Sequence, residues 1–226
     1  MARRPTTEEV DKAREYIRRR IDIQHHVELD IDQLLEEAAE SIALVVSKYK
    51  ARGMKLRFAG SSAMAREIDE ILQKLKDDID YYVFLYCSPE EASEEETTSI
   101  NAYVKGEFFD STYEQREALY LSNYRKILAL IGFENMEMDE EEFISAIREE
   151  AGKIEHRIML LAITTVGYGW MKYLLDTEGK GKSGFWVIPG SSHPCEFCVD
   201  MQSRFHPIDD PKPLYHPNCC CQIVYV

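Results

Sequence analysis

Five of the six cysteines lie between Cys195 and the end of the chain, in a pattern typical of a metal site. Cys195 and Cys198 form a Cys-x-x-Cys pair, which presents two sulfurs to one ion, and a second pair follows with His216 and a cysteine. Thiolate and imidazole are preferred ligands of Zn²⁺, and four protein ligands leave no open position for water. The sequence therefore predicts a structural Zn²⁺ site with Cys195, Cys198, His216 and either Cys219 or Cys221 as ligands.

The choice between Cys219 and Cys221 stays open at this level. Alternate side chains of an extended segment face opposite sides, so Cys219 and Cys221 would share a face from which Cys220 points away. The rival interpretations are reduced thiols without metal and a redox-active pair, although no thioredoxin-like βαβ pattern surrounds the cysteines. The sixth cysteine, Cys87, ends an apolar run and is interpreted as an inert core residue.

Other residues near the predicted ligands are assigned supporting roles. His193 and His206 are expected at the surface or beside the ligands rather than on the metal. Phe185 and Trp186 are expected to pack against the site.

Helical periodicity dominates the chain before this tail. Thr6 and Glu9 form a capping box that begins a first helix, and a second helix is expected to start near Asp30 or Asp32. Further helices are predicted after Ser62, over 111–131, and from Asp139 to about Leu175. Residues 185–189 and 222–226 read as two strands that pair around the metal site.

These elements predict a mainly α protein. A helical N-terminal body covers 1–177, with a candidate sub-boundary near 88–105. A small C-terminal α+β module, stabilised by zinc, covers 178–226.

The charge balance limits the classes of partner. The chain has 41 acidic and 27 basic residues and a net charge of -14, whereas binding of nucleic acid by the bulk surface needs Lys and Arg. The basic run Arg14–Arg20 is interpreted as a solvated helix face. The N-terminus lacks the apolar run of a secretion signal, and no apolar stretch is long enough to span a membrane. We therefore expect a soluble protein made in a cytosol.

An enzymatic alternative rests on two short matches. His26-x-Glu28 and Pro194-Cys195-x-x-Cys198 match the two halves of the zinc deaminase signature. Most of the chain separates them, and the second pair of ligands would close the coordination sphere. We therefore expect no enzymatic activity.

The tail resembles that of the phage head morphogenesis family, the minor head proteins similar to protein F of phage Mu. The family pattern is a Trp, a Cys-x-x-Cys pair, a loop, and Pro-x-His-Pro-x-Cys-Arg-Cys. Here it is matched by Trp186, Cys195–Cys198 and residues 213–221, with Cys220 in place of the Arg.

This resemblance implies a minor structural protein of a tailed bacteriophage head, located in the virion or procapsid and made in the host bacterial cytoplasm. Its implied partners are the portal and the capsid or scaffold proteins, with packaged DNA as a further partner. The assembly would set its oligomeric state, and no membrane is involved. The alternative is a zinc-ribbon-like nucleic-acid-binding or regulatory adaptor.

Overall fold

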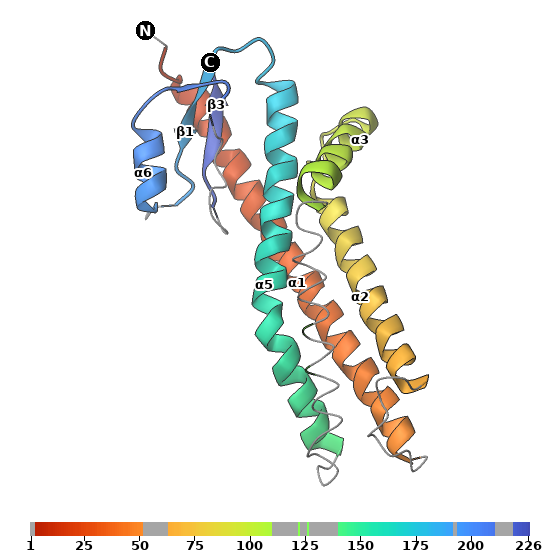
Figure 1. The fold of residues 1–226 in the computed structure, drawn as a ribbon. Helices are drawn as coiled ribbons and strands as arrows, with labels where there is room; N and C mark the ends of the chain where they lie inside the picture. The colour runs from red at the N-terminus through yellow and green to blue at the C-terminus, as the bar shows by residue number, and fades with distance from the viewer. Residues whose placement is uncertain are drawn as a thin grey trace. The chain divides into compact units, whose positions relative to one another are not determined.

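The structure is a computed structural model that describes residues 3–51, 63–109, 122, 126, 140–191, 194–210 and 219–226. Its helices are α1 (Thr7–Ala51), α2 (Ala63–Tyr86), α3 (Glu94–Tyr103), the π-helix η2 (Val104–Phe109), α5 (Glu140–Thr177) and α6 (Glu196–Gln202) (Figure 1). Its strands are β1 (Gly184–Ile188), β2 (His206–Pro207) and β3 (Gln222–Tyr225). The predicted mainly α fold with a small C-terminal α+β module is confirmed.

Helix α1 begins at the predicted capping box but is longer than expected. The Glu9 N–H donates to Thr6 Oγ1 at 3.2 Å, and the Thr6 N–H donates to Glu9 Oε2 at 2.8 Å. The expected break before Asp30 is wrong, because α1 runs without interruption to Ala51. No Gly or Pro stands at the expected break, and the fully buried Val27 and Ile31 continue the apolar stripe across it.

The other helices agree with the sequence predictions only in part. The starts of α2 and α5 agree with the predictions after Ser62 and at Asp139. The helix predicted over 111–131 lies outside the described residues, apart from positions 122 and 126. Helix α3 begins at a second capping box, formed by Ser93 and Glu96.

The chain forms two compact units. The first, here called the sheet unit, comprises Met1–Val27, Val83–Phe108 and Leu160–Val226. The second, here called the helical unit, comprises Glu28–Tyr82 and Phe109–Met159. The predicted boundary after residue 177 coincides with the end of α5, yet the residues that follow share a compact unit with the first turns of α1.

Within the helical unit, buried aliphatic side chains are bordered by ion pairs. The Tyr49 hydroxyl donates to Glu67 Oε1 at 2.6 Å, and Lys48 pairs with the same carboxylate at 2.7 Å. Arg148 pairs with Glu40 at 2.7 Å. The buried aliphatic residues of this unit include Ile31, Ile42, Val46, Ile68, Leu72, Ile79 and Ile147.

The sheet unit contains a three-stranded antiparallel sheet in the order β2-β1-β3. The predicted pairing of the two longer strands is confirmed, with Trp186 opposite Val224 and Ile188 opposite Gln222. Phe185 at the centre is fully buried, and its ring stacks on His206 at a centroid distance of 5.2 Å. The sheet therefore has a packed aromatic centre despite its small size.

Helix α5 packs closely against the end of α2 in the sheet unit. Trp170 Nε1 donates to the Tyr86 carbonyl oxygen at 2.9 Å, and the Trp170 ring lies edge-on to Tyr16 at 5.0 Å. Cys87 is fully buried, as expected of a core residue, and burial raises the pKa of its thiol. Gly169 leaves room for the Cys87 backbone at this contact.

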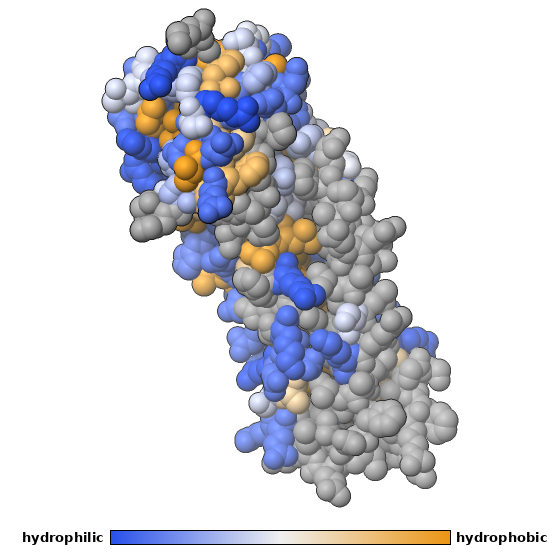
Figure 2. Space-filling model, turned by 60° about the vertical axis from the view of Figure 1, so that its left-hand side comes forward, coloured by the Kyte–Doolittle hydropathy of each residue, from blue (hydrophilic) through white to orange (hydrophobic). Residues whose placement is uncertain are grey.

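Contrary to the expectation from the sequence, one described helical segment, Arg157–Thr177 of α5, is long and apolar enough to cross a membrane, with a mean hydropathy of 1.4. However, 56% of its apolar window is buried, and the core helix of a soluble protein passes the same test. The segment by itself therefore carries no membrane assignment. On the face shown in Figure 2, hydrophobic residues in orange lie among hydrophilic residues in blue.

We predict that Gly169→Ala destabilises the sheet unit. An added Cβ would lie 2.3 Å from the Cys87 carbonyl oxygen and 2.8 Å from its Cβ. Such overpacking should lower the free energy of unfolding by about 1–3 kcal/mol, measured by urea denaturation. Gly106→Ala is the matched control, because nothing lies within 4 Å of its added Cβ. Equal stability of the two variants would contradict the close packing of α5 on Cys87.

Candidate metal site

Three cysteine sulfurs meet in the sheet unit. The Sγ atoms of Cys198, Cys219 and Cys221 all lie within 4.8 Å of one another, and all three residues are buried. The Cys198 and Cys219 sulfurs are 3.9 Å apart. A tetrahedral zinc site with Zn–S bonds of about 2.3 Å has S···S edges of about 3.8 Å. The group, here called the sulfur cluster, could therefore hold a metal ion without a large rearrangement.

Helix α6 supplies the first sulfur. Cys195 caps this helix, because its Sγ accepts a hydrogen bond from the Cys198 N–H at 3.4 Å. Cys198 and Met201 form the buried face of the short helix, whereas Phe197 and Val199 are about half exposed. Cys195 itself is exposed and lies outside the sulfur cluster, although its Sγ contacts the backbone of Cys198.

The approach to β3 supplies the other two sulfurs. Cys219 and Cys221 face the cluster together, and the partly exposed Cys220 is not in it, as expected for an extended segment. Both candidates for the fourth ligand are thus placed beside Cys198. The loop after β1 packs against this segment at Gly190, whose added Cβ would lie only 2.0 Å from the Cys220 carbonyl oxygen.

A buried arginine of α1 holds the same segment. Arg20 Nη2 donates to the carbonyl oxygens of Cys219 and Cys221 at 3.2 and 3.0 Å, and Nη1 donates to Gln222 Oε1 at 3.4 Å. Arg20 is fully buried, so the interpretation of Arg14–Arg20 as a solvated face is wrong at this residue. The spacing in the sequence does indicate that Arg20 is buried, because Arg20 lies three residues after Ile17 and seven before Val27 on the buried stripe.

The remaining predicted residues have mixed outcomes. His216 and His193 lie outside the described residues. His206 is fully buried rather than at the surface, with Nε2 2.7 Å from the Met201 carbonyl oxygen and Nδ1 3.1 Å from Asp210 Oδ2. It therefore fastens the end of α6 to β2 and is not in the sulfur cluster.

Two further expectations concern the neighbours of the site. Phe185 packs on His206, whereas the Trp186 Nε1 donates to the Arg3 carbonyl oxygen at 3.0 Å. The deaminase-like pair His26 and Glu28 is exposed on α1, and neither residue belongs to the sulfur cluster.

The environment of the cluster favours protonated thiols when no metal is bound. Burial raises the pKa of Cys198 to about 12. The hydrogen bond with Cys219, followed by burial, raises the pKa of Cys221. A metal ion must displace these protons, so binding would release protons to the solvent.

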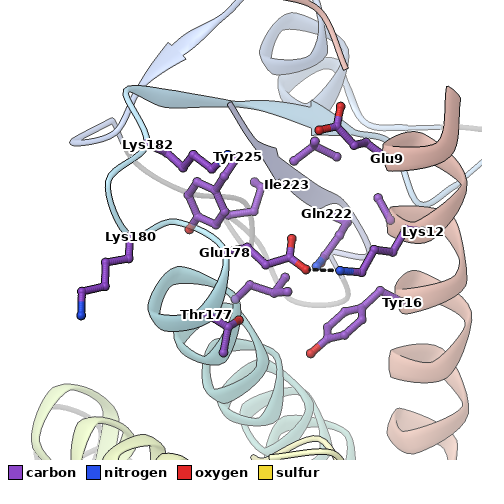
Figure 3. A pocket seen from close by; sticks show the side chains of 13 residues that line it. Glu9, Lys12, Tyr16, Thr177, Glu178, Lys180, Lys182, Gln222, Ile223 and Tyr225 are labelled. Carbon is purple, nitrogen blue, oxygen red and sulfur yellow. Dashed lines mark hydrogen bonds and ion pairs between the residues drawn. The ribbon is translucent and has the colours of Figure 1, made fainter. Parts of the chain in front are cut away.

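A pocket of about 370 Å³ lies on another part of the sheet unit, between the start of α1, the end of α5 and β3 (Figure 3). Lys12 and Glu178 form an ion pair of 2.5 Å among the residues that line it. The hydroxyl oxygens of Tyr16 and Tyr225 are shielded from solvent, and neither has a hydrogen-bond partner among the described residues. The lining mixes acidic and basic groups, and we assign no chemistry to this pocket.

Comparisons with known proteins do not assign the chain to a family. No family model matches it, and neither the curated proteins nor the solved structures include a match.

We predict that Gly190→Ala disrupts the sulfur cluster. Its Cβ would collide with backbone atoms of Cys220, which cannot move without carrying Cys219 and Cys221 with them. The variant should lose about 1–3 kcal/mol of unfolding free energy, and iodoacetamide should modify Cys221 faster than in the wild-type metal-free protein. Gly106→Ala again serves as the control. Unchanged protection of Cys221 would show that the loop does not hold this segment.

Proposed function

We propose that the sulfur cluster binds one structural Zn²⁺ that fastens α6 to the segment before β3 within the sheet unit. The observation that carries this proposal is the convergence of three buried sulfurs from α6 and the approach to β3. Their spacing fits the edge of a zinc–thiolate tetrahedron, and soft thiolate ligands select zinc over hard cations such as Mg²⁺.

The ligand set consists of Cys198, Cys219 and Cys221 with one further residue. Cys195 is the candidate on the described part of the chain, since its sulfur accepts a hydrogen bond from the Cys198 N–H. His216, a ligand predicted from the sequence, is the other candidate. A fourth protein ligand closes the coordination sphere, so the ion would supply folding free energy and no catalysis.

The proposed site predicts about one zinc per chain, measured by elemental mass spectrometry of the purified protein. Cys198→Ser should abolish binding and lower the melting temperature, because zinc binding is worth on the order of 10 kcal/mol in small zinc-dependent folds. Cys220→Ser should keep the metal, since Cys220 lies outside the cluster. The assignment fails if Cys198→Ser retains full zinc with an unchanged melting curve.

Cys195→Ser and His216→Ala then distinguish the two candidates for the last ligand. The variant that loses zinc identifies the ligand, and the other should bind zinc as the wild type does.

We further propose that the protein is a minor structural protein of a tailed-phage head, acting by binding in the head assembly. The support is the tail pattern of Trp186, the two cysteine pairs and His216-Pro217, on a mainly α protein with a small C-terminal module. The cysteines of this pattern include the sulfur cluster, as expected if the pattern encodes a metal-bound module.

Co-purification tests this second proposal. A tagged wild-type chain, expressed with a portal protein from the same genome, should elute with the portal ring in gel filtration. Cys198→Ser should lose that association because its C-terminal module is unfolded. Elution of the wild-type protein away from the portal, in the presence of zinc, would count against a head protein.

A further inference from the structure

Arg20 carries a positive charge into the interior of the sheet unit. Its side chain is fully buried, and the described groups that accept its hydrogen bonds are two backbone carbonyl oxygens and the Gln222 amide, which are all neutral. Its Nε has no partner among the described residues. A guanidinium remains protonated inside proteins, so this charge is permanent.

A buried charge without a counter-charge strongly destabilises a folded protein. Arg20 forms no ion pair with an Asp or Glu carboxylate within the described part of the chain. Its guanidinium instead contacts the backbone of Cys219 and Cys221, which carry two of the proposed metal ligands. A cysteine thiol carries no charge until a metal displaces its proton, so no described group compensates the guanidinium charge when the site is metal-free.

A metal–thiolate centre would supply the missing charge. Zn²⁺ with three thiolates and an imidazole, or with four thiolates, is net negative. The guanidinium lies against the backbone that carries two of the proposed ligands, so it would be attracted to such a centre. Groups that orient metal ligands in this way commonly determine metal affinity.

We infer that Arg20 is the counter-charge and positioning residue of a net negative metal–thiolate centre, through which metal binding at the end of the chain is coupled to its packing on α1. This inference rests on the proposed zinc site. It predicts that the effect of Arg20 on stability depends on metal occupancy. A purely structural arginine would not show this, because only a charge interaction with the metal centre changes when the metal binds.

The test compares Arg20→Gln, which keeps amide donors without charge, with Arg20→Lys, which keeps the charge. Zinc affinity is measured by competition with a chromophoric chelator on the full chain. Arg20→Gln should bind zinc about 10-fold or more weakly, while Arg20→Lys should stay closer to the wild type. Arg18→Gln is the matched control, because it removes an equal charge from an exposed position of the same helix and should leave the affinity unchanged.

Melting temperatures with zinc and with EDTA separate the electrostatic role from a structural one. The zinc-dependent increase should be smaller in Arg20→Gln than in the wild type, because its metal-free form no longer buries an uncompensated charge. An equal decrease of the melting temperature in zinc and in EDTA would overturn the inference, as would wild-type zinc affinity in Arg20→Gln. If Arg20→Gln does not fold, Arg20→Lys decides: near-wild-type affinity supports the inference, and a loss of 10-fold or more overturns it. A wild-type chain that binds no zinc would instead refute the zinc site itself.

Discussion

The hydrogen bonds from Arg20 to the carbonyl oxygens of Cys219 and Cys221 join the last segment of the chain to its first helix. One of the three strands of the sheet, β2, has only two residues, so packing against the helices adds to the stability of the sheet. Here it is held by contacts with the helices of its unit, including this buried guanidinium and the Trp186 bond to Arg3. The position of the cysteines therefore depends on α1 as well as on the sheet.

The same arrangement explains how so small a module can form a metal site. Cys195 caps α6 and turns Cys198 inward, while the extended approach to β3 places Cys219 and Cys221 on one face. Gly190 allows the loop after β1 to lie against the backbone between them. Each of these features is local, but all must be present together for three sulfurs to meet.

The proposed zinc and the buried arginine are complementary in charge. A chain with a net charge of -14 has many carboxylates, yet none is paired with Arg20 among the described residues. A thiolate centre differs from a carboxylate in being negative only when a metal has displaced the protons. Metal occupancy would then govern how well the final strand is held on α1.

The sequence by itself determined the fold class and the pairing of the two longer strands, and it indicated the cysteines from which the cluster is drawn while leaving the choice between Cys219 and Cys221 open. It could do so because helical periodicity, capping boxes and cysteine spacing are local properties of the chain. Even there it placed a break in α1, since the signals near Asp30 resemble a helix start while the absence of Gly and Pro lets the helix continue.

Only the tertiary structure decided which distant groups meet the cysteines. The stripe of Ile17, Arg20 and Val27 shows that Arg20 faces inward, but periodicity does not say which segment lies opposite. The close approach of Gly190 to Cys220 and the burial of His206 between Met201 and Asp210 are likewise set by loop packing. The physical reason is that contacts between residues far apart in the sequence depend on the whole packed unit. The type and spacing of metal ligands, in contrast, are properties of a short stretch of sequence.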